Sequence, residues 1–419
     1  MALRLQQRLF LSSMSCLILF VSLATVSNSI DAKPALKADS GATILPVLTL
    51  EGKWIREHDG STMLNPQTSG LVAAENGIWT ISDASADTSQ IQRLHLLDTS
   101  LTESSVDILS RLGPFELSEG IQQSCFAQYL ATAPDYEAMV AHPFKPQAWI
   151  LVTEDATRSG AMTEQCQARF AASGSTDFPT LLVEVQKQDT KMIVTGLRPV
   201  QFDVNDQIGN FPNDGIEGLA ILPPSSLPEL NGFSRLYLGL EKDATSSARV
   251  FMVDISASTF ENDAEFLPVK DAKLKLPTFE QGNHPINGMD IYTDASGQAW
   301  LIAAARNDNQ LWLIDLSGER KSKIIPLRYT APSSVSSQAC ILSENARVEA
   351  LDTAYINGGY YMHNASLEGV AVKGDSVFLV NDPWRRNYLR NVVCEQDRVF
   401  YERMSPLLFK TPIDPSWFK

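Results

Sequence analysis

The sequence is poor in positive charge. Its 34 lysines and arginines are outnumbered by 49 aspartates and glutamates, which gives a formal net charge of −15. Nucleic-acid binding needs clustered lysine and arginine to replace the counterions of the phosphates, so this composition argues against a surface for nucleic acid or another polyanion. The acidity favours solubility, and it leaves room for a small anionic or ester substrate held through a cation.

The motifs of several common enzyme classes are missing. The sequence has no Gly-x-Ser-x-Gly elbow, no His-Glu-x-x-His, no phosphate-binding loop and no dinucleotide fingerprint. These absences argue against a serine hydrolase of the α/β type and against the common nucleotide-binding folds. Stretches with helical periodicity are also few, and the stretch from Leu101 to Leu112 is the best candidate for a helix.

Long apolar runs are confined to the N-terminus. Arg4 and Arg8 precede an apolar run from Leu9 to Val26, and small polar residues follow at 27–29. This pattern predicts a secretory signal peptide over 1–29, and hence a periplasmic or extracellular protein, although the run is also long enough for an uncleaved anchor. No other stretch could span a bilayer, so we expect no stable membrane insertion after cleavage. Residues 30–46 read as a linker, and 47–419 as one domain.

Cysteines are also few. Of the five, Cys16 lies in the signal, so four remain in the exported chain. An even number in an oxidising compartment favours two disulfides, for which three pairings are possible. Proximity in the sequence favours Cys125 with Cys166 and Cys340 with Cys394. A metal–thiolate site is not favoured, because no two cysteines lie within two to four residues of each other.

The sequence does contain an internal repeat. A polar, a small and a large apolar residue are followed by a turn and by an apolar strand that ends in acidic or amide residues. The five copies begin at Ser69, Glu137, Glu217, Asn287 and Glu368. Among the strands predicted from β-branched and aromatic runs are Ile78–Ile81, Trp149–Thr153, Leu236–Leu240, Val250–Ile255, Trp300–Ala304, Leu311–Ile314 and Val377–Val380. Units of this kind predict an all-β fold, a β-propeller of five or six blades.

The form of the repeat has a physical explanation in a propeller. The small residue lets the innermost strands of neighbouring blades approach each other, and the large apolar residue packs between blades. The polar residue then points into the central channel. The carboxylates of Glu137, Glu217 and Glu368 would meet there, where they repel each other unless they are protonated or share a cation.

Two of the repeats resemble the phytase-like propeller family, often called "esterase-like activity of phytase". The stretches are Asp214-Gly215-Ile216-Glu217-Gly218-Leu219-Ala220, and Leu367-Glu368-Gly369-Val370-Ala371 with Leu379-Val380-Asn381-Asp382. The resemblance covers about 48–402, and it implies an exported bacterial propeller that binds calcium. The consecutive Asp-Asp-Pro-Ala stretch of true β-propeller phytases is missing, which puts phytate hydrolysis in doubt.

The axial residues are the candidate metal ligands. Glu137, Glu217, Asn287 and Glu368 offer the carboxylate and amide oxygens that Ca²⁺ accepts; alternatively, they hydrogen-bond to backbone amides of the next blade. A second set of residues ends the second strand of each repeat, where they would line the channel or cap turns. This set comprises Asp83, Glu154, Glu241, Asn381 and Asp382.

Three residues are candidates for catalysis. Arg306 stands where the other copies carry an acidic or amide residue, so it would pair with an axial carboxylate or hold a substrate phosphate or carboxylate. His284 and His363 lie three and five residues before the axial residues of their repeats. Each is a candidate general base or metal ligand, or a surface histidine. The loop Asp382-Pro383-Trp384-Arg385-Arg386 reads either as a packed tryptophan with solvated arginines or as an anion-binding rim.

Three functions remain open from the sequence. The first is a calcium-dependent hydrolase of esters or phosphoesters with its site in the axial channel. The second is a non-catalytic propeller that serves as a platform for a ligand or a protein. The third is a lactonase-like propeller enzyme with the same type of axial glutamate and asparagine site.

Overall fold

The computed structural model describes most of the chain after residue 40. The described residues are 41–101, 105–132, 134–154, 164–166, 168, 179–206, 208, 215–226, 231–241, 243, 245, 247–261, 265–279, 282–344 and 355–419. The predicted signal peptide lies outside them. Among these residues, no helix is long and apolar enough to cross a membrane.

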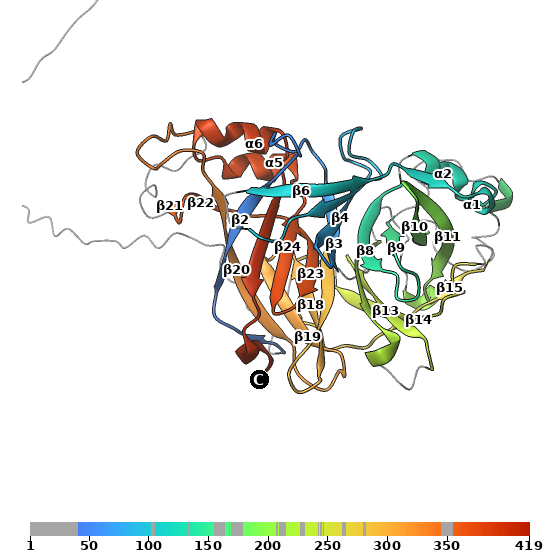
Figure 1. Cartoon of the computed structure of the whole chain (residues 1–419). Coiled ribbons are helices and arrows are strands. Elements are labelled where there is room, and N and C mark those ends of the chain that lie inside the picture. Colours follow the sequence, from blue (N-terminus) through green and yellow to red (C-terminus); the bar gives the residue numbers. More distant parts are fainter. Residues whose placement is uncertain are drawn as a thin grey trace, which may run out of the picture. The chain divides into compact units, whose positions relative to one another are not determined.

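Twenty of the described strands form five antiparallel units of four strands each (Figure 1). Blade 1 contains β3 (Thr68–Ala74), β4 (Gly77–Ser82), β5 (Leu94–Leu97) and β6 (Ser105–Leu112). Blade 2 contains β8 (Tyr136–Ala141), β9 (Ala148–Thr153), β10 (Leu181–Gln188) and β11 (Lys191–Gln201). Blade 3 contains β12 (Ile216–Leu222), β13 (Ser234–Leu240), β14 (Arg249–Ile255) and β16 (Lys270–Asp271). Blade 4 contains β17 (Gly288–Thr293), β18 (Ala299–Ala305), β19 (Gln310–Asp315) and β20 (Lys323–Pro332).

Blade 5 combines strands from the two ends of the described chain. Three of its strands follow one another, and the fourth comes from the beginning of the domain and pairs with β25 in antiparallel register, Gly52 opposite Phe409. The strands are β23 (Leu367–Lys373), β24 (Ser376–Asn381), β25 (Leu407–Pro412) and β2 (Leu48–Arg56). The residues outside the five sequence repeats therefore complete the fifth blade.

The first strands of the five blades contact each other in a closed ring, in the order β3, β8, β12, β17, β23 and back to β3. Small residues make this possible. A Cβ atom on Gly70 would lie 2.9 Å from the Cα atom of Ala138 in the next blade, and one on Gly369 would lie 3.0 Å from the carbonyl carbon of Gly70. The ring makes the fold a β-propeller, and the predicted all-β propeller and the role of its small residues are confirmed.

The large apolar residue of each repeat packs between blades, as predicted. Each of the five is buried, and each belongs to a cluster that also contains residues of the preceding blade. They are Leu71, Met139, Leu219, Met289 and Val370. The core is therefore divided into five layers between blades, and each fully buried side chain of this size contributes about 1.5–3 kcal/mol.

Two expectations about local structure were wrong or incomplete. The stretch from Leu101 to Leu112, predicted as a helix, contains β6, because Val106 and Ile108 are buried while Asp107 and Leu109 are exposed, a period of two. Within the predicted linker, β1 (Thr43–Ile44) pairs with β20 in parallel register.

One face of the propeller carries most of the irregular structure. The first strand of each blade begins on this face and the second strand ends on it, so the connections between blades and between second and third strands lie here. We call it the mouth face. Its helices lie along the top of Figure 1 and are α1 (Glu119–Gln122), α2 (Ala127–Thr132), α5 (Arg385–Tyr388) and α6 (Arg398–Glu402).

The shorter elements accompany these blades and connections. The strands are β7 (Phe115–Leu117), β15 (Leu267–Pro268), β21 (Tyr355–Ile356) and β22 (Gly359–Met362). The 3-10 helices are η1 (Val204–Asp206), η2 (Pro224–Ser226), η5 (Leu389–Asn391), η6 (Glu395–Asp397) and η7 (Pro415–Phe418). β7 extends blade 2 by pairing with β11.

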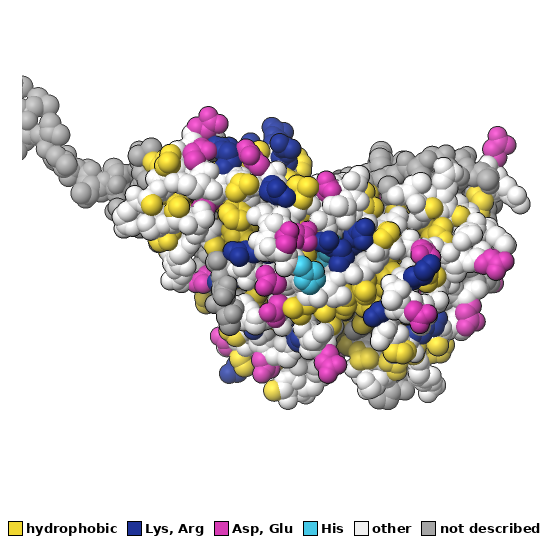
Figure 2. All heavy atoms as spheres, turned by 45° about the horizontal axis from the view of Figure 1, so that its top comes forward, with side chains coloured by type: hydrophobic (Ala, Val, Ile, Leu, Met, Phe, Trp, Pro, Cys, Tyr) yellow, Lys and Arg dark blue, Asp and Glu magenta, His cyan; other side chains and the backbone are white. Residues whose placement is uncertain are grey.

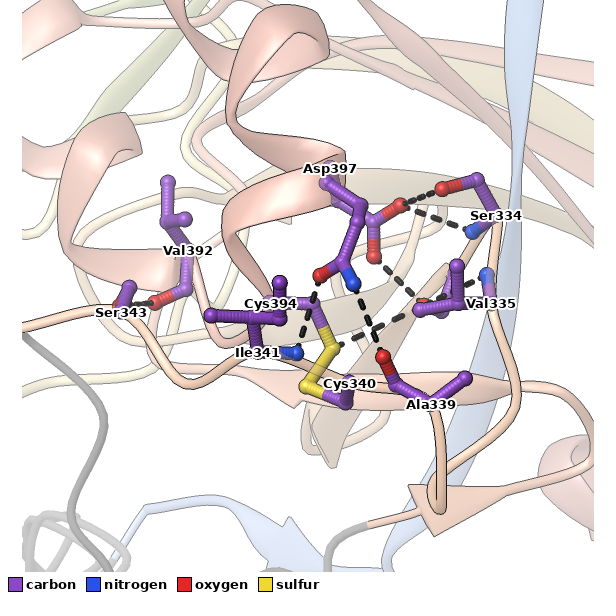
Figure 3. The surroundings of a disulfide bond; sticks show 11 residues. Ser334, Val335, Ala339, Cys340, Ile341, Ser343, Val392, Cys394 and Asp397 are labelled. Atoms are coloured by element: carbon purple, nitrogen blue, oxygen red, sulfur yellow. Dashed lines mark hydrogen bonds between the residues drawn. A yellow bond between two sulfur atoms is a disulfide. The ribbon is translucent and has the colours of Figure 1, made fainter.

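Both disulfides join connections of the mouth face, and both predicted pairings are confirmed. Cys125 is bonded to Cys166, and Cys340 to Cys394. Around the second disulfide, the carboxylate of Asp397 accepts hydrogen bonds from the backbone and hydroxyl of Ser334, at 2.8 and 2.6 Å (Figure 3). The connection between blades 4 and 5 is thereby fixed to the connection that carries α5 and α6.

Candidate functional site

Three of the predicted axial acids lie at β-bulges. The pairing of the first strand with the second shifts register at Glu137 in blade 2, at Glu217 in blade 3 and at Glu368 in blade 5. A bulge leaves one residue without a partner in the ladder and redirects its side chain. All three acids are thus unpaired residues of the strand ladder, and they lie at the mouth end of the channel.

Asn287 connects blade 4 to this group. Its Nδ2 donates a hydrogen bond to Oε2 of Glu217 at 3.2 Å, and the side chain is fully buried. Its Oδ1 has no hydrogen-bond partner among the described residues. A buried carbonyl-type oxygen without a donor is costly, and it is a suitable ligand for a hard cation.

Further carboxylates surround Glu137 and Glu217. Carboxylate oxygens of Asp135, Glu137 and Glu154 lie within 4.8 Å of one another, and so do those of Glu154, Glu217 and Glu241. Because Glu154 belongs to both groups, the five residues form one continuous set, which we call the acidic cluster. Four of them are at most 8% exposed, and Glu137 is half-buried.

The electrostatics of the cluster disfavour five negative charges. Desolvation, together with the carboxylates of Glu217 and Asp135, raises the pKa of Glu137 well above its ordinary value. Burial raises the pKa of Glu217 to about 7, although the charge of Arg306 opposes this rise. The cluster must therefore hold protons or a cation near neutral pH.

Arg306 lies between Glu368 and the acidic cluster. Its Nη1 donates a hydrogen bond to Oε1 of Glu368, and its Nη2 lies 3.6 Å from Oε1 of Glu241. Despite its burial, the carboxylates of Glu217 and Glu241 raise the pKa of Arg306 above its ordinary value. Glu368 thus contacts a cation of the chain directly, whereas Glu217 interacts with Arg306 only at longer range.

The residues that end the second strands divide into two groups. Asp83 caps a turn, since its Oδ1 accepts the backbone N–H of Ser85 at 2.5 Å, whereas Glu154 and Glu241 belong to the acidic cluster. Asp382 is half-buried beside Arg306, and burial raises its pKa to about 7. Its proton is therefore held more tightly than that of an ordinary aspartate.

The two candidate histidines differ in their surroundings. His284 is 6% exposed, its Nδ1 lies 2.8 Å from Oδ2 of Asp308, and its ring stacks on Phe279 at 3.9 Å. Because Asp308 follows Arg306 by two residues and Asn287 follows His284 by three, this pair fastens together the two backbone segments that carry Asn287 and Arg306. His363 is exposed, and its backbone N–H donates to Oδ1 of Asn391.

Asp135 was missed in the sequence. It lies just before β8, its Oδ1 accepts the N–H of Ala84 from blade 1 at 3.3 Å, and it is 2% exposed. The other four repeats carry Gln67, Gly215, Pro285 and Ser366 at the equivalent position. Comparison of the repeats therefore could not identify Asp135 as a candidate site residue.

No family model and no curated protein matches the chain. Among solved structures, a putative exo-β-1,3-galactanase from Bifidobacterium bifidum s17 is similar over 88% of this chain and 94% of its own, with 9% identity and a TM-score of 0.40. An α-L-arabinanase from Penicillium chrysogenum covers 87% of this chain and 98% of its own, with 10% identity and a TM-score of 0.37. A luciferin-regenerating enzyme covers 83% and 92%, with 9% identity and a TM-score of 0.33. Likeness at this level says nothing of substrate or chemistry.

Replacing Glu217 by glutamine is expected to stabilise the metal-free protein at pH 8. A carboxyl whose pKa is about 7 in the folded state and about 4.3 unfolded loses stability as the pH rises from 4 through 7. Glutamine removes this loss of stability, so the gain is on the order of 3–4 kcal/mol at pH 8 and nearly vanishes at pH 4. Urea unfolding at both pH values measures it.

Glu184 in blade 2 provides the control with the opposite sign. Burial would raise its pKa, but hydrogen bonds from His142, Lys145 and Thr195 outweigh burial and lower the pKa to about 2. The Glu184 carboxylate therefore adds to the free energy of unfolding above pH 4.3, and this contribution is lost as the pH falls towards 2. Glu184→Gln should therefore destabilise the protein at pH 8; a stabilising Glu184→Gln, or a neutral Glu217→Gln, would contradict these assignments.

Proposed function

We propose that the chain is an exported, phytase-like propeller protein that hydrolyses an ester or phosphoester with the help of calcium bound at the acidic cluster. The observation that carries the proposal is the set of five carboxylates from blades 2 and 3, whose oxygens lie within 4.8 Å of one another in two groups that share Glu154. Arg306 alone cannot neutralise them.

The residues of the site fit calcium. Calcium takes six to eight oxygen ligands from carboxylates and amides, and it tolerates irregular geometry. Glu137, Glu154 and Glu217 supply carboxylates, and the buried Oδ1 of Asn287 supplies an amide oxygen. Glu368 is a weaker candidate than the sequence indicated, because Arg306 already neutralises it. When bound, the ion would polarise the oxygen of the scissile ester group.

The chain's own residues would bind the substrate and move a proton. The side chain of Arg306 is 28% exposed, so it offers a positive charge at the mouth to an anionic group. Asp382 lies beside it with a pKa of about 7, which suits a group that donates a proton to the leaving alcohol. The pair of His284 and Asp308 would hold Arg306 and Asn287 in place.

The test combines metal analysis with turnover. We expect the purified protein to bind calcium and to cleave p-nitrophenyl phosphate or p-nitrophenyl acetate, and to lose this activity with a chelator. Glu217→Gln should weaken calcium binding and turnover at least tenfold, because it removes a charged ligand.

Glu116→Gln is the matched control. Glu116 is an exposed glutamate of β7 that pairs with Lys191, so its loss should change neither calcium binding nor turnover. A protein without calcium and without turnover would favour the non-catalytic platform. Chelator-sensitive cleavage of lactones, without cleavage of the two esters, would favour the lactonase-like alternative.

A further inference from the structure

A tryptophan and several arginines lie together on the mouth face. Trp384 precedes α5 and is 56% exposed, more than any other described aromatic side chain. Arg385, Arg386 and Arg390 follow it and are all exposed. Figure 2, turned to bring this face forward, shows Lys and Arg side chains on it, interspersed with Asp and Glu side chains. We call Trp384 and the three arginines the arginine rim.

The positive charge of the rim is not used within the described part of the chain. None of its three arginines forms an ion pair there, whereas Arg111, Arg235 and Arg249 each do. The acids of the same connection are largely engaged: Glu395 binds Arg398, and Asp397 binds Ser333 and Ser334. Arg386 and Arg390 are four residues apart on continuous helical backbone, where like charges repel unless an anion lies between them.

The rim is built on a rigid base. The buried hydroxyl of Tyr388 donates to the backbone oxygen of Ser405 at 2.7 Å, and its ring packs on Tyr401. Oδ1 of Asn391 accepts the backbone N–H of His363, and the disulfide at Cys394 follows. A fixed backbone needs no further ordering on binding, so only the immobilised side chains lose conformational entropy.

The rim also adjoins the channel. Asp382 at the end of β24 lies beside Arg306, and Trp384 follows only two residues later. A ligand on the rim would therefore lie next to the mouth. The net charge of −15 argues against attraction of a polyanion to the molecule as a whole, so the interaction depends on the local charge of the three arginines of the rim.

We infer that the arginine rim binds an acidic polysaccharide. The indole of Trp384 offers the flat apolar surface on which a sugar ring stacks, and Arg386 and Arg390 offer paired N–H donors that match a carboxylate. This inference does not depend on hydrolysis at the axial site, since binding to the rim involves none of the residues of the acidic cluster.

Affinity electrophoresis of the full chain through gels with polygalacturonate or neutral dextran tests the inference. We expect retardation by polygalacturonate only, weaker at about 500 mM than at about 50 mM salt. Trp384→Ala, and Arg386→Gln with Arg390→Gln, should each weaken binding about tenfold without changing the thermal midpoint, because all three side chains are exposed.

Two controls match these variants. Phe233→Ala removes an exposed aromatic side chain from the turn between β12 and β13, and Arg328→Gln removes an exposed arginine from β20; both should bind like the wild type. Equal migration in the two gels, or unchanged binding by the Trp384 and arginine variants, would overturn the inference. Tighter binding of a single-stranded oligonucleotide than of polygalacturonate would also overturn it.

Discussion

Replacing Gly288 by valine is expected to prevent the ring from closing. A Cβ atom at this position would collide with the carbonyl oxygen of Glu368 and lie 2.9 Å from its carbonyl carbon and 3.1 Å from the Cα atom of Gly369. These are backbone atoms of the innermost strand of the next blade, so no side chain can move aside. We expect a loss of more than about 4 kcal/mol of unfolding free energy, measured by urea denaturation.

Substitutions at two other glycines provide a comparison for the loss of stability at Gly288. At Gly218 a Cβ atom would meet the flexible Met289 side chain, 3.1 Å from its Cγ, so Gly218→Ala should cost only about 1 kcal/mol. At Gly120 a Cβ atom would meet nothing within 4 Å, and Gly120→Ala should be neutral or stabilising. Equal effects at the three positions would show that the blades do not approach each other as described.

Replacing Arg306 by methionine is expected to destabilise the protein by about 3 kcal/mol. The change leaves the carboxylate of Glu368, whose side chain is 3% exposed, without its cation, and breaking a buried pair from one side costs about this much. The double variant with Glu368→Gln should recover at least half of the loss. Thermal and urea unfolding of both variants measure the effect.

The pH dependence of the Arg306→Met variant provides an independent test. Arg306 opposes the effect of burial on the pKa values of Glu217 and Asp382, so its loss raises both pKa values further. Groups with raised pKa values stabilise the folded state at low pH, so the variant should recover stability between pH 8 and pH 5. Arg235→Met, which removes a partly exposed pair with Asp254, should cost under about 1 kcal/mol at either pH. An Arg306→Met variant with the same free energy of unfolding at pH 8 and pH 5 would contradict these effects of Arg306 on the two pKa values.

The innermost strands could be predicted from the sequence because they repeat. Each must present a small residue to one neighbour and an apolar residue to the core between blades, so Gly369 and Val370 recur in equivalent form in every copy. The outer strands are under no such common constraint. β6 was taken for a helix, and β16 has only two residues.

The candidate site could be predicted only in part, for a similar reason. Glu137, Glu217 and Asn287 occupy the repeated position, and the structure brings them together at the channel. The bulges that turn the acids out of the strands leave no mark in the sequence. Asp135 arises in one blade alone, and the pairing of His284 with Asp308 depends on how two connections meet. Features that belong to a single blade can be found only in three dimensions.

The use of β2 in blade 5 sets the order in which the molecule can be completed. β2 is made before the other four blades, but its partner β25 begins at Leu407. β2 can therefore pair with β6 as soon as blade 1 has been made, but it must wait for Leu407–Pro412 before it can pair with β25. We expect the ring to close only after β25 has been made, and the part of β2 that pairs with β25 to be an unpaired β-edge until then.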